Sequence, residues 1–324
     1  MSHSQQQILL KTFSKQVIFF PDFQIAYSQL QKSVEATALR GTPSCAFIMG
    51  MTGAGKTTLC KLFRDSFGPT QEILTKDGVH KKIPALYVSP SCTPMTNKGF
   101  CLAILEELGC MPPRTSFQEL TQMLVRQLDT AGVELLIFDE IQRLLRPDAE
   151  KTRQAFLDWV VALLSLTKIP IALCGDETCE KLLITEAKAN SPFARRYCYT
   201  ATLEYFAFED NLETPYYMTL SELDKAMYKI LGLQGAVHLQ APSIALPLFI
   251  ASAGILEYIR QVIYEALSIA VSRPHPMLTV SDFVDACHTL RLPRNLAGKT
   301  KNPFNLTRPQ CLAIIDNYYS KPPK

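Results

Sequence analysis

Short apolar runs alternate with longer amphipathic ones through the first two thirds of the chain. A run of about four to eight apolar residues bounded by turn residues is typical of a buried strand, whereas apolar positions three and four residues apart are typical of a helix. Their alternation predicts an α/β fold in which helices cover both faces of a parallel sheet. We expect strands at residues 46–49, 84–89, 134–139, 169–174 and 197–203, and helices between them at residues 97–108, 116–131 and 149–166.

The pattern changes after residue 206, where the periodicity is helical only. The expected helices lie at residues 220–231, 243–252, 255–271 and 280–290, and the turns between them contain glycine or proline. The chain is therefore predicted to have four parts. These are an entry segment that packs onto the α/β domain (residues 1–40), the α/β domain (41–205), a small all-α lid domain (206–290) and a tail (291–324).

A phosphate-binding loop lies between the first predicted strand and the helix after it. Residues 49–58 match G-x-x-x-x-G-K-[ST] at every fixed position. The glycines let backbone N–H groups converge on a triphosphate, while Lys56 reaches the outer phosphates and Thr57 gives its hydroxyl to Mg²⁺. A glycine-rich turn that binds nothing is disfavoured by the order of strand, loop and helix. The residues expected to contact the nucleotide here are Gly50, Thr52, Gly53, Ala54, Gly55, Lys56, Thr57 and Thr58.

A second nucleotide motif lies downstream, where an apolar strand at residues 134–138 ends in two carboxylates. Asp139 is expected to hold Mg²⁺ together with Thr57, and Glu140 to orient the attacking water. A kinase would not need the second carboxylate, so the pair favours ATP hydrolysis over phosphate transfer. An acidic helix cap is the alternative interpretation of the pair. A small-molecule phosphotransferase and a nucleotide-gated interaction protein without useful catalysis stay open as alternative functions.

Composition places the chain among cytoplasmic proteins without a membrane segment. It has 324 residues, is 47% hydrophobic, and contains neither a long apolar run nor an apolar signal segment. Its ten cysteines form no C-x-x-C pair, so we expect reduced thiols. The net charge is only +3, yet the tail holds seven basic residues against one acidic residue. The prolines of this basic tail predict an extended segment that touches nucleic acid or an acidic partner, or that merely keeps the protein soluble.

An α/β phosphate-loop domain followed by a helical lid resembles an AAA+ ATPase, and within that class the chain is similar to the TnsC/TniB group of transposition regulators. The similarity covers most of residues 17–290. Beyond the two nucleotide motifs it rests on Phe20-Pro21-Asp22-Phe23, Tyr87-Val88-Ser89-Pro90, Asn97-Lys98-Gly99-Phe100, Leu105-Glu106-Glu107-Leu108-Gly109, residues 141–145, Leu173-Cys174-Gly175-Asp176, Arg195-Arg196-Tyr197 and residues 254–260.

This resemblance implies an ATP- and Mg²⁺-dependent regulator that oligomerises on duplex DNA by contacting its backbone, as a ring or a helical filament with a heptameric or hexamer-like turn. Such a protein links a target-selection protein, TniQ- or TnsD-like or part of an RNA-guided complex, to the transposase, and ATP hydrolysis disassembles it. It would be bacterial, cytoplasmic and associated with the nucleoid when bound to DNA. A helicase-loader or replication-initiator type of AAA+ ATPase is the alternative.

The resemblance also assigns residues outside the two motifs. Arg196, with Arg195 in reserve, stands where an arginine is expected to reach the γ-phosphate of the neighbouring subunit, although a solvated arginine pair fits the sequence too. Asp176 occupies the place of a polar γ-phosphate sensor, where a carboxylate would repel phosphate unless water or metal intervenes. Both sensor assignments stay open, because the lid positions nearest the expected spacing after Gly254 are Glu257 or Tyr258, and Arg260 lies beyond them. The DNA-backbone contacts implied are Lys98, Arg114 and Thr115.

Overall fold

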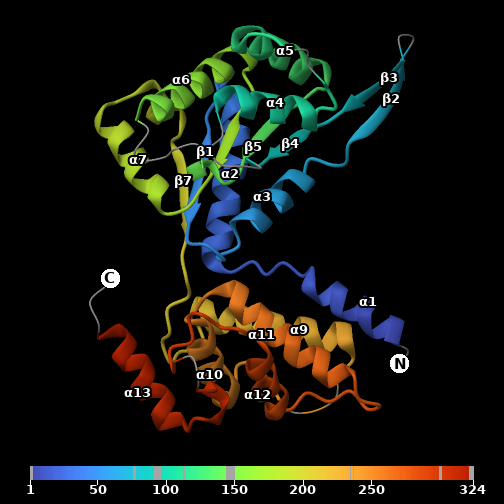
Figure 1. Ribbon diagram of the computed structural model, residues 1–324, viewed down its shortest axis with the longest axis vertical. Coiled ribbons are helices and arrows are strands. Elements are labelled where there is room, and N and C mark those ends of the chain that lie inside the picture. Colours follow the sequence, from blue (N-terminus) through green and yellow to red (C-terminus); the bar gives the residue numbers. More distant parts are fainter. Residues whose placement is uncertain are drawn as a thin grey trace. The chain divides into compact units, whose positions relative to one another are not determined.

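The computed structural model describes residues 3–75, 78–90, 96–111, 114–143, 150–233, 235, 237–298 and 301–320. The chain forms two compact units (Figure 1). The α/β unit comprises Asp22–Leu203, and the helical unit combines Met1–Pro21 with Glu204–Lys324.

A five-stranded parallel sheet forms the centre of the α/β unit, in the order β4-β5-β6-β1-β7. The strands are short, and all except the edge strand β7 have mostly buried side chains, as expected for a parallel sheet covered on both faces. The α/β fold and the predicted strand positions are confirmed. The strands are β1 (Ala46–Gly50), β4 (Ala85–Val88), β5 (Leu135–Phe138), β6 (Ile171–Cys174) and β7 (Tyr199–Leu203).

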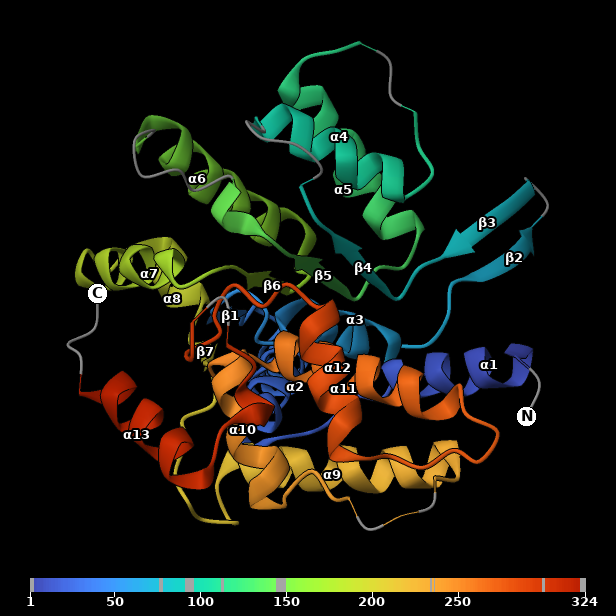
Figure 2. The ribbon, with the colours of Figure 1, turned by 60° about the horizontal axis from the view of Figure 1, so that its bottom comes forward.

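Helices cover both faces of this sheet. Figure 2 shows α4, α5 and α6 on one face and α2 and α3 on the other. The first face holds one continuous core that includes Phe100, Phe138 and Trp159, so Trp159 has the core role that its helical stripe indicates. The helices of the unit are α2 (Pro21–Arg40), α3 (Lys56–Asp65), α4 (Asn97–Glu107), α5 (Phe117–Thr130), α6 (Glu150–Thr167), α7 (Thr178–Lys188) and α8 (Pro192–Arg196), with a 3-10 turn η1 (Ile141–Arg143).

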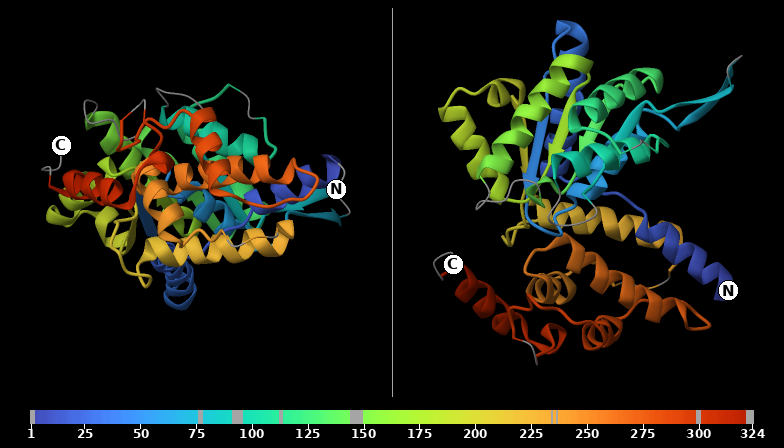
Figure 3. Two further views of the ribbon diagram at one scale, coloured as in Figure 1. Left: turned by 90° about the horizontal axis from the view of Figure 1, so that it is seen from below. Right: turned by 45° about the horizontal axis from the view of Figure 1, so that its top comes forward.

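An antiparallel hairpin, β2 (Gln71–Thr75) and β3 (Gly78–Lys82), projects from the α/β unit (Figure 1 and Figure 3). The apolar pattern of the sequence does not predict this hairpin, because Gln71, Glu72, Ile73 and Leu74 are all exposed and the strand carries no buried apolar run. Helices α7 and α8 were missed for a related reason: their apolar positions are few and the helices are short.

The helical unit contains α1 (His3–Ser14), α9 (Pro215–Leu231), α10 (Pro242–Ser252), α11 (Leu256–Val271), α12 (Val280–Thr289), η2 (Pro303–Asn305) and α13 (Arg308–Tyr319). Helix α1 packs against α9 and α11. The prediction that the whole entry segment packs onto the α/β domain is therefore wrong for α1, whose Leu10 and Phe13 are buried within the helical unit. The apolar pattern of α1 indicates a buried face, yet no feature of it specifies which domain covers that face.

The basic tail is folded where the structure describes it, contrary to the predicted extended segment. Helix α13 packs on α10 and buries Cys311 and Ile315, and the Phe208 N–H donates to the Tyr319 hydroxyl at 2.7 Å. Proline in the first turn of α13 starts this helix instead of breaking it, because the missing N–H is not needed there. None of the helices in the described ranges combines the length and the apolar character required to cross a membrane.

Candidate nucleotide site at the carboxyl end of the sheet

The phosphate loop begins at the end of β1, where Gly50 pairs with Leu203 of β7. Gly50 has a φ of 151°, and a Cβ there would lie 2.2 Å from the Leu203 carbonyl oxygen. Met51 N–H donates to that same oxygen at 3.1 Å. Gly53 and Gly55 also have positive φ angles, and Gly55 is the N-cap of α3. The loop therefore depends on glycine, and it delivers the positive N-terminal end of a ten-residue helix to the carboxyl edge of the sheet.

Lys56 is held inside this loop. Its side chain is only 7% exposed, and Nζ donates to the carbonyl oxygens of Gly50 at 2.8 Å and Met51 at 2.9 Å. Hydrogen bonds to carbonyl oxygens compensate part of the cost of burying the ammonium group. The ammonium charge of Lys56 therefore lies at the loop, close to any anion that binds there.

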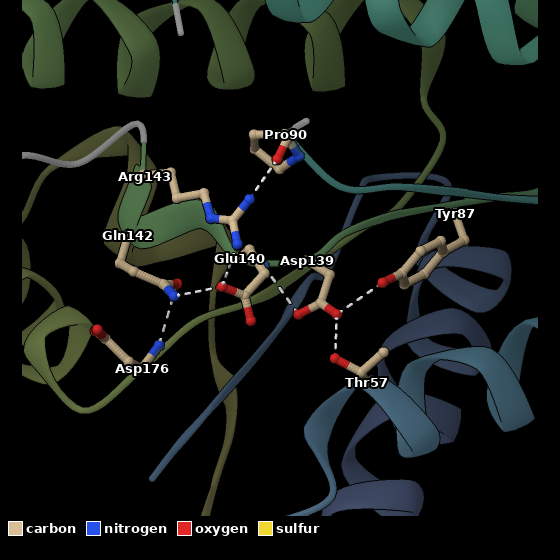
Figure 4. Close-up of polar contacts among 8 residues, drawn as sticks. All are labelled: Thr57, Tyr87, Pro90, Asp139, Glu140, Gln142, Arg143 and Asp176. Atoms are coloured by element: carbon tan, nitrogen blue, oxygen red, sulfur yellow. Dashed lines mark hydrogen bonds and ion pairs between the residues drawn. The ribbon is translucent and has the colours of Figure 1, made fainter. Parts of the chain in front are cut away.

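Asp139 follows β5, is fully buried, and joins the two nucleotide motifs (Figure 4). Its Oδ2 accepts hydrogen bonds from the Thr57 hydroxyl at 2.7 Å and the Tyr87 hydroxyl at 2.8 Å, and its Oδ1 accepts from the Glu140 N–H at 2.9 Å. No cationic side chain of the described residues pairs with this carboxylate. A buried carboxylate without a cation, beside a threonine hydroxyl, fits a hard divalent metal such as Mg²⁺.

Two thiols lie beside Asp139 without adding to the metal donors. One ligand atom each of Cys60, Asp139 and Cys174 lies within 4.8 Å of the others. The pKa of the Cys174 thiol is raised well above its ordinary value, first by its hydrogen bond with Cys60 and then by burial. The thiol therefore stays protonated, and the oxygen donors of Thr57 and Asp139 are the ones that suit Mg²⁺.

Tyr87 is a site residue for which the sequence analysis assigned no role. It lies on β4, next to β5, and its ring also carries Lys61 Nζ at 5.5 Å from the centroid. Burial raises the pKa of its phenol, and the hydrogen bond to Asp139 raises it further, so the hydroxyl remains a donor. The available signal was a tyrosine among apolar residues on the strand that neighbours the acidic one.

Glu140 has an unusual backbone and an anchored side chain. Its φ of 56° lies in the left-handed region, which costs a non-glycine residue of order 1–3 kcal/mol. Gln142 Nε2 donates to Glu140 Oε2 at 2.9 Å, and an Arg143 guanidinium nitrogen lies 3.4 Å from the same oxygen. Gln142 and Arg143 were quoted only as part of the family resemblance, and the sequence analysis gave neither a role.

Asp176 follows β6, and its carboxylate is hydrogen-bonded to Thr178 at the start of α7. Its Oδ1 accepts from the Thr178 N–H at 3.0 Å and from the Thr178 hydroxyl, which fastens the start of α7. Its backbone N–H donates to Gln142 Oε1 at 3.3 Å. The side chain therefore closes a helix end, and contact between Asp176 and a nucleotide stays a prediction.

The two candidate arginines end α8 and differ in their surroundings. Arg196 is partly buried and donates to the Pro43 carbonyl oxygen at 3.4 Å. Arg195 is exposed, and its guanidinium makes no hydrogen bond or ion pair with the described residues. The geometry therefore favours Arg195 as the group free to reach another subunit, whereas the sequence analysis preferred Arg196.

The three predicted DNA contacts lie together at the adjacent starts of α4 and α5. Lys98 Nζ donates to the Thr115 carbonyl oxygen, and Arg114 is exposed beside it. Thr96 and Ser116 cap the two helices. Glu119 also lies here; its carboxylate accepts from the Thr115 hydroxyl and from Ser116, and these hydrogen bonds lower its pKa. The patch thus offers two helix N-termini and two cations against one carboxylate.

Arg260, the lid arginine left open by the sequence analysis, is engaged within the helical unit. Its guanidinium donates to the carbonyl oxygens of Ser14 and Gln16, each at 2.8 Å, and closes the C-terminal end of α1. Burial lowers its pKa. Arg260 therefore has a structural role that accounts for its position.

The family model described as "Bacterial TniB protein" matches residues 10–200. The comparison with curated proteins yields no match.

Among solved structures, the chain is similar to the Aeropyrum pernix ORC1 protein, solved in complex with DNA, with a TM-score of 0.54 and 19% identity over 82% of this chain and 65% of that one. It is also similar to the Aeropyrum pernix ORC2 protein, with a TM-score of 0.56 and 15% identity over 85% of this chain and 71% of that one. Cdc6p from Pyrobaculum aerophilum is similar with a TM-score of 0.56 and 13% identity over 84% of this chain and 69% of that one. The chain spans slightly less than two thirds of the ORC1 protein. Because the identities to these three structures are below 20%, the similarity shows a shared fold and nothing more.

Proposed function

We propose that this chain, which belongs to the bacterial TniB family, is an ATP- and Mg²⁺-dependent AAA+ ATPase that regulates transposition and assembles on duplex DNA. It would connect a target-selection protein, TniQ- or TnsD-like, to the transposase. The observation that carries the catalytic part is the fully buried Asp139 carboxylate, hydrogen-bonded to Thr57 of the phosphate loop and without a cationic partner among the described residues.

The residues of the site divide the work of hydrolysis between binding and water activation. The N–H groups of the loop and the start of α3 would bind the phosphates, and Lys56 would exchange its carbonyl partners for phosphate oxygens. Thr57 and Asp139 would hold Mg²⁺, which neutralises charge on the phosphates when bound. Glu140 would orient the attacking water. Gly50, Thr52, Gly53, Ala54, Gly55 and Thr58 complete the proposed nucleotide contacts.

Assembly into an oligomer is supported by an unpaired cation. The guanidinium of Arg195 is exposed and unpaired within the described chain, at the end of a helix whose backbone is fixed by the Cys45 N–H bond to the Arg196 carbonyl oxygen. An exposed guanidinium on a fixed backbone suits the γ-phosphate of a neighbouring subunit, where it would stabilise charge on the equatorial oxygens. Arg196 would serve mainly to anchor α8.

Binding to duplex DNA would use the patch of Lys98, Arg114 and Thr115. Cations, a hydroxyl and two helix N-termini are groups that contact phosphates, and they carry no base-reading pattern. The proposed contact is therefore independent of DNA sequence, and the target-selection partner would supply specificity.

The test of the proposal combines ATPase assays with electron microscopy on duplex DNA. We expect phosphate release to require Mg²⁺, to rise on adding DNA, and to rise more steeply than protein concentration. Glu140→Gln should lower the rate about a hundredfold or more while ATP binding persists, and should leave protein trapped on DNA as rings or filaments. Absence of any assembly with DNA and a slowly hydrolysed ATP analogue would overturn the proposed assembly.

A helicase-loader or replication-initiator role shares the same fold and the same nucleotide site. The two roles differ in the partner protein. Capture of the cognate transposase, and not of a helicase, by the ATP-bound Glu140→Gln protein on DNA is the expected result.

A further inference from the structure

We propose that Gln142, assisted by Arg143, is the positioning residue that aims Glu140 at the attacking water; this inference rests on the proposed ATP hydrolysis. It starts from an asymmetry in the Glu140 carboxylate. Oε2 is bound by Gln142 and faced by Arg143, whereas Oε1 has no hydrogen-bond partner among the described residues. Figure 4 shows Oε2 turned toward Gln142 and Arg143, and the other oxygen pointing away from them. One oxygen is anchored, and the other is left for water.

The orientation of the Gln142 amide is fixed from both ends. The backbone N–H of Asp176 can only donate, so it must face the amide oxygen, at 3.3 Å. The amide nitrogen then faces Glu140 Oε2, at 2.9 Å. An amide held in this way presents a donor to the carboxylate and leaves little freedom to rotate.

Space for this amide is provided by Gly175. A Cβ at that position would lie 3.4 Å from Gln142 Oε1, 3.1 Å from Ile141 Cγ1 and 2.5 Å from Cys179 Sγ. The loop after β6 can therefore approach the turn after β5 closely enough for the hydrogen bond between Asp176 and Gln142.

Arg143 connects Glu140 to the segment that follows β4. One of its guanidinium nitrogens donates to the Pro90 carbonyl oxygen at 2.7 Å, just after β4, while the other faces Glu140 at 3.4 Å. Glu140 is thus tied to the segments that follow β4, β5 and β6. The Asp176 carboxylate takes no part in this anchor because it is bound to Thr178. The polar side chain that links the end of β6 to the Glu140 carboxylate is therefore that of Gln142, and not that of Asp176.

The decisive variant is Gln142→Met, which keeps the length of the side chain and removes both hydrogen bonds. Misplacing a group that acts on water costs about ten- to a hundredfold in rate. We expect kcat for ATP to fall by that factor, while KM for ATP, the affinity for a fluorescent ATP analogue and the melting temperature stay unchanged. The matched control is Gln154→Met on α6, where an exposed glutamine donates to Asp158 of the same helix, and it should leave kcat unchanged.

A second arm separates positioning from a structural effect. In a Glu140→Gln background, Gln142→Met should cause no further loss, because there is no carboxylate left to position. The same fold loss in that background, an unchanged kcat, or a raised kcat that marks Gln142 as a restraint on Glu140, would each overturn the inference. These outcomes leave the proposed function intact, provided that wild-type protein hydrolyses ATP and that Glu140→Gln hydrolyses it much more slowly.

Discussion

At the scale of single residues, the site is organised around carboxylates that are already oriented. Asp139 has three hydrogen-bond donors on its two oxygens, and Glu140 has one oxygen anchored. Orienting groups before a ligand arrives avoids reorganisation when the charge develops. Among these donors we test Tyr87, because its hydroxyl would stay bound to Asp139 once Thr57 turns to Mg²⁺.

Tyr87→Phe should raise the Mg²⁺ concentration for half-maximal ATPase activity about tenfold, since partners that orient a metal ligand contribute to affinity on that scale. The ring that faces Lys61 is kept, so folding should be unaffected. Activity is measured across a Mg²⁺ titration at saturating ATP. Tyr264→Phe, at an exposed tyrosine of α11, is the control. A Mg²⁺ requirement that does not rise would show that Tyr87 does not orient Asp139.

At the scale of secondary-structure elements, the sequence best predicts the strands and helices whose apolar residues recur with a regular period because one face is buried. The five strands and helices such as α4, α5 and α6 were predicted because their apolar residues face a common core. The hairpin β2–β3 is exposed and has no such period. The same reasoning applies to the site. Fixed motifs gave Lys56, Thr57, Asp139 and Glu140, whereas the roles of Tyr87, Gln142 and Arg143 arise from contacts between strand ends that no local pattern specifies.

Gly50→Ala tests how the contact between β1 and β7 shapes the phosphate loop. The added Cβ would clash with the Leu203 backbone, so we expect a loss of more than about 2 kcal/mol in the free energy of unfolding, together with loss of ATP binding. Gly41→Ala separates the clash from the backbone angle, because Gly41 has φ of 64° and open space around it. That control should cost about 1 kcal/mol by denaturant unfolding. Equal costs for both variants would contradict the steric argument.

At the scale of the whole molecule, the chain passes between the two units twice, after Pro21 and after Leu203. The first residues therefore complete the helical unit, where Arg260 fastens the end of α1. The lid domain therefore includes the N-terminal helix α1. The sequence could not predict this, because all the other lid helices follow the α/β domain in the chain. Arg260, whose sensor role stays open, is bound to the carbonyl oxygens of Ser14 and Gln16, and the exposed Arg195 of the α/β unit is the arginine that we propose for a neighbouring subunit.

Mixing two inactive variants tests whether the catalytic site is shared between subunits. Arg195→Ala should lower the DNA-stimulated ATPase rate about a thousandfold with ATP binding retained, as expected for an arginine that acts in trans. Adding Glu140→Gln protein should restore activity, because the Arg195→Ala subunit keeps Glu140 and its neighbour supplies Arg195. In a head-to-tail assembly, random equal mixing makes roughly a quarter of the interfaces complete.

Arg153→Ala on α6, where the arginine faces Glu150 of the same helix, should behave as wild type. Failure of mixing to restore activity for Arg195→Ala, with recovery for Arg196→Ala, would assign the shared arginine to Arg196. No recovery with either variant would show that the site is complete within one chain.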